Sequence, residues 1–199
     1  MKVPTGSYKL SSHPGDRSFK IQSTTKDITL RIPTLIETTT LLDILGNQEN
    51  SKFDKSISDA STHELESIAH RWTTISHPLT HLHFLIWNGH TPIGITGFGW
   101  IGPCDDTQPD GPRAGAAGIV LQPFARGKGF AYEALKLVFE YGLCELGLAE
   151  IRIGSYSENL PMRMVMKKFG LVARTFGGVV DEFGNDLLWI VRLDDLGSF

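Results

Sequence analysis

Two spacings of apolar residues alternate along this chain. In one kind of segment, apolar and polar residues alternate or apolar residues form a short unbroken run, which is typical of strands. We expect strands over residues 28–32, 83–87, 93–101, 114–121, 150–156, 171–180 and 187–193. Asn88 and Gly89 separate the second strand from the third, and this dipeptide predicts a tight hairpin.

In the other kind of segment, apolar residues recur at every third or fourth position, as on a helix with one buried face. These segments cover residues 35–45, 62–72, 131–143 and 159–169. Thr34 precedes the first, Ser61 or Thr62 opens the second and Asn159 begins the last, and all of these residues are good helix N-caps. The chain therefore mixes helices with strands.

The order of these elements excludes two common architectures. It runs strand, two helices, three strands, helix, strand, helix, two strands, which is neither a doubly wound sheet nor a barrel. Residues 47–59 and 102–113 are polar and rich in turn formers, so we expect loops there. The prediction is an α/β (α+β) fold with one domain over residues 26–199. An irregular arm, residues 1–25, precedes it, and its alternating segment 19–22 suits a short strand.

Composition narrows the class of protein. The chain has 199 residues and a formal net charge of -3, so it has no excess of cations to neutralise a nucleic-acid backbone. Two cysteines, Cys104 and Cys144, are too few for a disulfide framework. No apolar run reaches the roughly 18 residues of a membrane span, and the first residues lack the apolar core of a signal peptide. We expect a cytoplasmic protein that binds neither nucleic acid nor membrane.

The stretch most informative about chemistry covers residues 119–131. It reads IVLQPFARGKGFA, in which a buried strand passes through a loop with two glycines and two cations into a helix. The N–H groups of such a loop and of the helix N-terminus form an anion-binding nest. Gly127 and Gly129 let a ligand approach the backbone, and Arg126 and Lys128 add positive charge. The loop therefore predicts a phosphate or diphosphate ligand.

Two nucleotide-binding motifs do not fit this loop. The Walker pattern requires Ser or Thr directly after its lysine, but Lys128 is followed by Gly129. The dinucleotide pattern GxGxxG lacks its third glycine, because Tyr132 stands at that position.

The loop instead resembles the acyl-coenzyme A loop of the GCN5-related N-acetyltransferase (GNAT) superfamily. That pattern is Gln or Arg, two residues, Gly, one residue, then Gly or Ala, and it matches Arg126, Gly129 and Ala131. Downstream, Asn159 and the segment KFGL at 168–171 also resemble segments of that family.

Upstream, residues 30–33 and 89–94 resemble the ribosomal-protein alanine acetyltransferase branch. The similarity covers roughly residues 28–193 and agrees with the order of elements predicted above.

The resemblance implies a fold, a co-substrate and a set of site residues. The fold would be a mixed, splayed central sheet of about seven strands flanked by about four helices. The co-substrate would be acetyl-CoA, with no metal, and the N–H of Val120 would donate to the thioester oxygen. The implied cofactor-binding residues are Ile119, Val120, Leu121, Arg126, Gly127, Lys128, Gly129, Phe130, Ala131 and Asn159.

The implied reaction is direct attack of a primary amine, on a small molecule or a protein N-terminus, on the acetyl carbonyl. The departing thiolate needs a proton, yet Met162 and Met166 stand where the family usually has its donor. Either water supplies the proton, or Tyr156 or Ser157 does so. The alternative is a catalytically weak acyl-CoA-binding protein that acts as a sensor or partner-binding module. The apolar segment 188–191 suits the edge of a homodimer or a core strand.

Seven histidines raise the question of a metal site. His63 begins a segment like HExxH, but Ser67 stands where the second histidine is required. We expect a solvated helix face there and no metal. His83 and His90 are further candidates for a general base.

Overall fold

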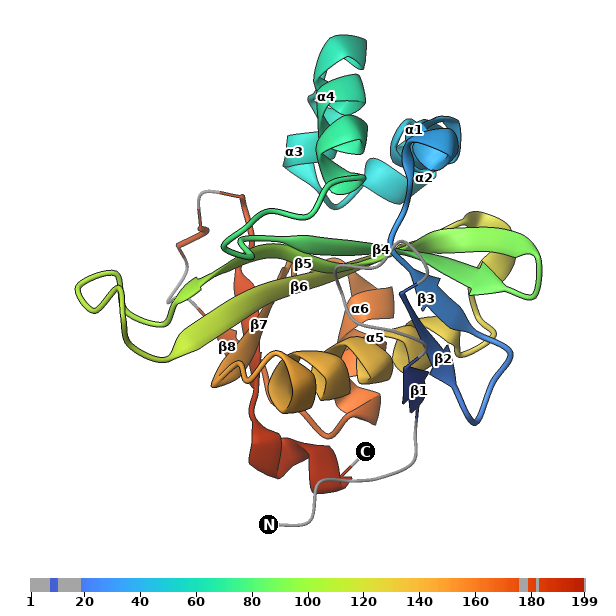
Figure 1. Ribbon diagram of the computed structural model, residues 1–199. Helices are drawn as coiled ribbons and strands as arrows, with labels where there is room; N and C mark the ends of the chain where they lie inside the picture. The colour runs from blue at the N-terminus through green and yellow to red at the C-terminus, as the bar shows by residue number, and fades with distance from the viewer. Residues whose placement is uncertain (1–7, 11–18, 176–178, 182, 199) are drawn as a thin grey trace.

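The computed structural model describes residues 8–10, 19–175, 179–181 and 183–198. Its centre is a nine-stranded sheet in the order β1-β2-β3-β4-β5-β6-β7-β9-β8 (Figure 1). All pairings in this sheet are antiparallel except that of β6 with β7. The strands are β1 (Tyr8–Leu10), β2 (Lys20–Ser23), β3 (Thr29–Arg31), β4 (Leu82–Asn88), β5 (Thr91–Pro103), β6 (Arg113–Leu121), β7 (Glu150–Ser155), β8 (Arg174–Thr175) and β9 (Leu187–Val191).

Helices lie on both faces of this sheet (Figure 1). One face carries α1 (Thr38–Leu45), α2 (Gln48–Ser51), α3 (Lys55–Ser58) and α4 (Thr62–Trp72). The other face carries α5 (Phe130–Glu140) and α6 (Leu160–Lys168). Shorter helical turns are η1 (Leu35–Glu37), η2 (Pro123–Ala125), the π-helical turn η3 (Tyr141–Glu145) and η4 (Leu193–Ser198).

Each face of the sheet has its own apolar core. The larger cluster joins the sheet to α5 and α6, and it contains the fully buried Phe84, Phe98 and Phe139. The smaller cluster lies under α1 and α4 and includes Leu41 and Leu85. Phe84 and Leu85 are neighbours on β4, and successive side chains of a strand point to opposite faces. The central strand β4 is therefore buried on both sides.

The strands β6 and β7 run parallel but stay paired only briefly. Three residue pairs join them, and the last is between Ala116 and Arg152. β6 continues to Leu121 and β7 continues to Ser155 without further pairs between them. Beyond this point β6 keeps only β5 as a neighbour and β7 keeps only β9. The sheet therefore opens between β6 and β7.

The predicted fold class is confirmed, with two additions to the number of elements. The sheet has nine strands where about seven are predicted, because β1 and β2 extend it beyond β3. Both added strands lie in the N-terminal arm, and β2 overlaps the segment 19–22 that suits a short strand. Residues 1–7 and 11–18 of that arm lie outside the described part of the chain.

The other addition is in residues 47–59, predicted as a loop, which form the short helices α2 and α3. Each begins at a capping side chain. Asn47 accepts a hydrogen bond from the N–H of Glu49, and Asp54 accepts one from the N–H of Ser56, both at 3.0 Å. Such caps stabilise a single helical turn without apolar periodicity, so the hydrophobic pattern alone does not reveal these helices.

The predicted terminal hairpin is present in part. β9 agrees with the predicted last strand, but β8 has two residues, and residues 176–178 of the predicted strand lie outside the described part. Before β9, the Asp181 side chain accepts hydrogen bonds from the N–H groups of Phe183 and Asn185 at 2.9 and 2.8 Å. This aspartate therefore shapes the turn that leads into β9.

Gly115 on β6 has no room for a side chain. A Cβ there would lie 2.8 Å from Cδ1 of Phe98 and 2.9 Å from Cδ1 of Leu148. We expect Gly115→Ala to lower the free energy of unfolding by about 1–3 kcal/mol through overpacking. Gly99→Ala on β5 is the matched control, because no atom of the described residues lies within 4 Å of its Cβ position. Urea unfolding measures both variants, and equal stability would contradict the prediction.

Candidate active site

The loop between β6 and α5 has the backbone of an anion-binding nest. After the turn η2, Gly127 and Gly129 adopt φ values of +75° and +77°, a left-handed conformation that favours glycine. Gly129 is the N-cap residue of α5, so the N–H groups of the first helical turn point into this loop. No described atom lies within 4 Å of a Cβ position at Gly127, and the loop is open there.

The remaining loop residues lie around this nest. Lys128 is exposed, and its backbone carbonyl accepts a hydrogen bond from Nζ of Lys26 at 2.9 Å. Phe130 and Ala131 begin α5 and pack, half-buried, against the larger core. Lys26 comes from the turn between β2 and β3. Sequence reasoning missed it because 102 positions separate it from Lys128 and no local motif marks it.

Arg126 lies in the loop, but its side chain turns toward α2. Its Nε donates to the Leu121 carbonyl at 3.0 Å, and its Nη2 donates to Oδ1 of Asn50 at 2.6 Å. Its Nη1 also lies 3.7 Å from the Glu49 carboxylate, an exposed ion pair of little energetic weight. The guanidinium therefore ties β6 to α2, while only the backbone of Arg126 takes part in the nest.

The direction of the backbone along β6 distinguishes among Ile119, Val120 and Leu121, the three cofactor-binding residues that the resemblance implies on this strand. The N–H of Gln122 donates to the carbonyl of Ile93 at 2.9 Å, and the N–H of Cys104 donates to the carbonyl of Pro112 at 2.7 Å. The backbone groups of successive residues in a strand point to alternate sides. Both bonds therefore mean that the even-numbered residues of β6 direct their N–H and C=O groups at β5.

This alternation corrects the assignment of Val120 as the oxyanion donor. Val120 is an even-numbered residue of β6, so its N–H faces β5 and is directed away from the gap. Ile119 and Leu121 face the gap, which agrees with the hydrogen bond from Arg126 to the Leu121 carbonyl. The N–H of Ile119 is thus the candidate donor on this strand.

Tyr156 follows β7 and lies between α3 and the turn before β9. Its hydroxyl donates to the Phe183 carbonyl at 3.0 Å, and its ring centroid lies 6.3 Å from that of Phe53. Partial burial, together with the carboxylates of Asp54 and Asp181, raises the pKa of the Tyr156 hydroxyl above its ordinary value. The phenol therefore remains protonated at neutral pH.

Ser157 and Asn159 are both engaged in local hydrogen bonds. The N–H of Ser157 donates to Oδ1 of Asp186 at 2.6 Å, and hydrogen bonding from Ser157 holds the pKa of that carboxyl below its usual range. Asn159 caps α6, because its Oδ1 accepts from the N–H of Met162 at 3.2 Å. Its Nδ2 donates to Oγ of Ser155 at 3.1 Å, so the cap also fixes the end of β7.

Ser155 is a hydroxyl that sequence reasoning missed. It is 4% exposed and ends β7 on the face that also buries Ile151 and Ile153. Its Oγ accepts from Asn159, and among the described residues no acceptor is recorded for its own proton. The available signal was a polar residue at a position where the alternation calls for an apolar one.

Two of the three methionines of α6, Met162 and Met166, belong to the core. Met166 is fully buried, and Met162 packs against the same larger cluster. A thioether has no proton to give, so α6 supplies an apolar wall at the two positions where the resemblance leads one to look for a donor.

On the face of the sheet that packs against α1 and α4, three paired residues lie in a row across β4, β5 and β6. His83 on β4 pairs with Gly97 on β5, which pairs with Gly118 on β6. Gly118 lies on the same face as Val120, which packs against the core under α1 and α4. Gly118 is exposed, and no described atom lies within 4 Å of its Cβ position. The sheet is therefore uncovered beside the gap.

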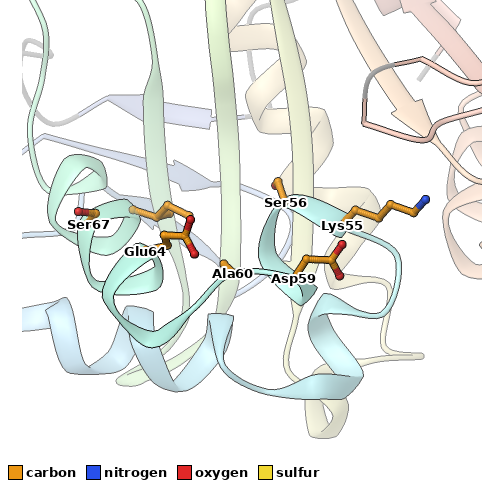
Figure 2. Close-up of a pocket in the computed structure, with 7 residues that line it drawn as sticks. Lys55, Ser56, Asp59, Ala60, Glu64 and Ser67 are labelled. Atoms are coloured by element: carbon orange, nitrogen blue, oxygen red, sulfur yellow. The ribbon is translucent and has the colours of Figure 1, made fainter.

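A surface hollow of about 390 Å³ lies between α3 and α4 (Figure 2). Figure 2 shows the two helices on either side of it, with strands of the sheet behind. None of the residues predicted to bind the cofactor lines it. Its lining consists of Lys55, Ser56, Asp59, Ala60, Glu64, Ser67 and Ile68.

Two features, a cluster of metal ligands and a membrane-spanning helix, are absent from the described residues. Within them, no three His, Cys, Asp or Glu side chains gather as the ligands of a metal ion would. No helix in that part of the chain combines the length and the apolar character needed to cross a bilayer.

A mixed sheet that opens beside a glycine loop at a helix N-terminus is the arrangement expected of an acyl-CoA-dependent acyltransferase. Comparison with known proteins agrees. A family model described as "Acetyltransferase (GNAT) domain" matches residues 27–172. The chain therefore belongs to the GNAT acetyltransferase family, and the resemblance found in the sequence is confirmed.

Individual relatives are more distant. The "Uncharacterized N-acetyltransferase YnaD" of Bacillus subtilis (strain 168) is 41% identical over 54 residues, which are 27% of this chain and 32% of that protein. The match thus spans less than two thirds of this curated relative.

Two solved structures share the fold. Spermidine N-acetyltransferase from Vibrio cholerae, in complex with CoA and spermine, has a TM-score of 0.69 at 19% identity and covers 85% of this chain and 98% of its own. RimL, a ribosomal L7/L12 alpha-N-protein acetyltransferase in complex with coenzyme A, has a TM-score of 0.68 at 13% identity. The match covers 86% of this chain and 97% of RimL.

His83 is a poor general base, because its buried ring resists taking up a proton. Its ring stacks on Trp72 with centroids 4.1 Å apart. Burial, reinforced by the neighbouring His81 and Arg71, lowers the pKa of His83 to about 3. In the unfolded chain a histidine has a pKa of about 6.5. Between these two values only the unfolded chain binds the proton, so stability falls as the pH decreases through this window.

We therefore expect His83 to contribute a slope of at most about 1.4 kcal/mol per pH unit to the free energy of unfolding below pH 6.5. His83→Gln should remove this contribution, whereas His90→Gln on the exposed hairpin turn should retain it. Urea unfolding between pH 7 and about 5 measures the slopes. Identical slopes for the wild type and His83→Gln would show that the prediction is wrong.

Proposed function

We propose that this chain is an N-acetyltransferase that moves an acetyl group from acetyl-CoA to a primary amine by direct attack. The gap between β6 and β7, beside the glycine loop of α5, carries this proposal. The gap offers the backbone groups of Ile119 and Leu121 to an extended chain that contains amides. The loop offers N–H groups to a diphosphate. Coenzyme A carries these two features along one molecule.

In this proposal each part of the cofactor has its own residues. Ile119 and Leu121 bond the pantetheine arm, and residues 126–131 hold the diphosphate through their backbone. The carbonyl of Leu121 becomes available when Arg126 releases it, since the Nε of Arg126 donates to it at 3.0 Å. Asn159 acts indirectly, because its cap fixes the end of β7 on the other side of the gap.

The chemistry needs three things of the site. The N–H of Ile119 stabilises the negative charge that develops on the thioester oxygen. The amine attacks in its neutral form, so it loses a proton to water or to a carboxylate. The departing thiolate then takes a proton from Tyr156, Ser157 or water, and Tyr156 is suited because its raised pKa keeps its proton in place.

The surroundings of Tyr156 favour a cationic acceptor. Asp54 and Asp181 both act electrostatically on its hydroxyl, and such carboxylates attract an ammonium group before it loses its proton. The uncovered sheet at Gly118 leaves room beside the gap for an acceptor. Two structural neighbours are named for amine acceptors, a polyamine and a protein α-amino group. We take a small-molecule amine or a protein N-terminus as the acceptor class.

One observation favours a second candidate, a catalytically weak acyl-CoA-binding protein that serves as a sensor or partner-binding module. Met162 and Met166 make α6 an apolar wall. The hydroxyl of Tyr156 donates a hydrogen bond to the Phe183 carbonyl, and the backbone N–H of Ser157 donates one to Asp186. A site in which these groups are already hydrogen-bonded binds the cofactor and transfers the acetyl group slowly.

Thiol release from acetyl-CoA, measured with polyamines and with peptides that have free N-termini, separates the two candidates. Release that depends on an amine, with the acetylated amine detected by mass spectrometry, supports the enzyme. Coenzyme A binding in a calorimeter without release for any amine supports the binder. No coenzyme A binding contradicts both.

Gly127 provides the sharpest test of the loop. Gly127 and Gly147 both have positive φ, and within the described part of the chain neither has a neighbour within 4 Å of its Cβ position. Alanine therefore costs similar backbone strain at each, about 1 kcal/mol. Only at Gly127 does the new methyl group project into the nest. We expect Gly127→Ala to weaken coenzyme A binding at least about tenfold and Gly147→Ala to leave it unchanged. Calorimetric titration measures both, and equal affinities would remove the loop from the site.

The proton donor is tested by Tyr156→Phe and Ser157→Ala. If one of these hydroxyls protonates the thiolate, its removal should lower kcat by about a hundredfold without changing the KM for acetyl-CoA. The alkaline limb of the kcat profile should move with the same variant. Unchanged kcat in both variants would assign the proton to water or to Ser155, and Ser155→Ala distinguishes these.

A further inference from the structure

The turn between β2 and β3 fixes a lysine on the cofactor loop. Nζ of Lys26 donates to the backbone carbonyl of Lys128 at 2.9 Å. The same nitrogen lies 5.6 Å from the centroid of the Phe130 ring and 3.1 Å from the Cβ position of Gly129. The ammonium group therefore rests on the residues that lead directly into α5.

This position is built into the fold, because the turn is docked on α5. Glu133, in the first turn of α5, is 5% exposed, and its carboxylate accepts hydrogen bonds from the hydroxyls of Ser23 and Thr25. Oγ of Ser23 also accepts from the backbone N–H of Lys26 at 3.1 Å. The backbone of Lys26 is thus held at one place relative to the helix N-terminus.

The hydrogen bond of Lys26 sets the direction of one peptide in the nest. In a trans peptide the C=O and N–H groups point to opposite sides. Since Lys26 binds the carbonyl of Lys128, the N–H of Gly129 points away from Lys26. We propose that Lys26 is a positioning residue for the diphosphate of acyl-CoA: it orients this peptide so that its N–H faces the diphosphate, and it places a positive charge behind it.

The two cations of the loop itself do not perform this task. The guanidinium of Arg126 is bonded to Leu121 and Asn50. The side chain of Lys128 is exposed and makes no recorded contact within the described part of the chain. Lys26 is fixed both at its backbone and at its ammonium group. The inference rests on the proposed function, because it assumes that acyl-CoA is the ligand of the loop.

Three variants test it: Lys26→Met, Lys26→Arg and, as the matched control, Lys20→Met on the exposed side of the same hairpin. Coenzyme A is titrated into each by calorimetry, and kcat and KM are measured with acetyl-CoA. We expect Lys26→Met to weaken binding about tenfold and to raise KM with kcat unchanged. Lys26→Arg should restore most of the affinity, and Lys20→Met should behave as the wild type.

The outcomes separate this inference from the proposed function. If the wild type binds coenzyme A and Lys26→Met binds it as tightly as Lys20→Met, the role of Lys26 is refuted and the proposed function stands. If the wild type binds no coenzyme A, the proposed function fails and the inference fails with it. Titration with 3′-dephospho-CoA should show the same loss for Lys26→Met. A loss that vanishes with this ligand would assign Lys26 to the 3′-phosphate and overturn the diphosphate role.

Discussion

The structure depends on the parting of β6 from β7 after Ala116 and Arg152. Strand edges are costly to bury unless their N–H and C=O groups find partners. β5 satisfies the even-numbered residues of β6, so the groups left over belong to Ile119 and Leu121, and Arg126 already bonds one of them. A ligand that carries its own amides meets this need. In the proposed reaction the protein recognises its cofactor through an incomplete sheet, which is why the cofactor side needs few special side chains.

The parts of the site that rest on local backbone chemistry could be predicted from the sequence. Gly127 and Gly129 stand where positive φ is required, and Asn159 stands at a helix start. The local backbone requirement at each position therefore accounts for the residue found there. The direction of each N–H along β6 depends on the register of β6 with β5. Hydrogen bonds on either side of the paired region define that register. One residue of register reverses the answer, so the sequence alone does not distinguish the N–H of Val120 from that of Ile119.

Contacts between distant segments were the least predictable. Lys26 meets Lys128 because Ser23 and Thr25 bond a buried carboxylate on α5, and none of these residues belongs to a recognisable motif. The helices α2 and α3 escape prediction for a local reason, because their capping residues Asn47 and Asp54 are equally common in turns. A contact between distant segments leaves no spacing to recognise in the sequence, and a local cap does not by itself distinguish a helical turn from another turn.

Positive and negative charges occupy different places around the gap, which the net charge of -3 does not show. Lys26 and Lys128 lie at the loop, where the diphosphate is proposed to bind, whereas Asp54 and Asp181 lie around Tyr156. An anionic cofactor that entered at the Tyr156 end would meet carboxylates, and a cationic amine that entered at the loop would meet ammonium groups. In the proposed reaction, repulsion therefore helps to direct the anionic cofactor to the glycine loop and the cationic amine to Tyr156.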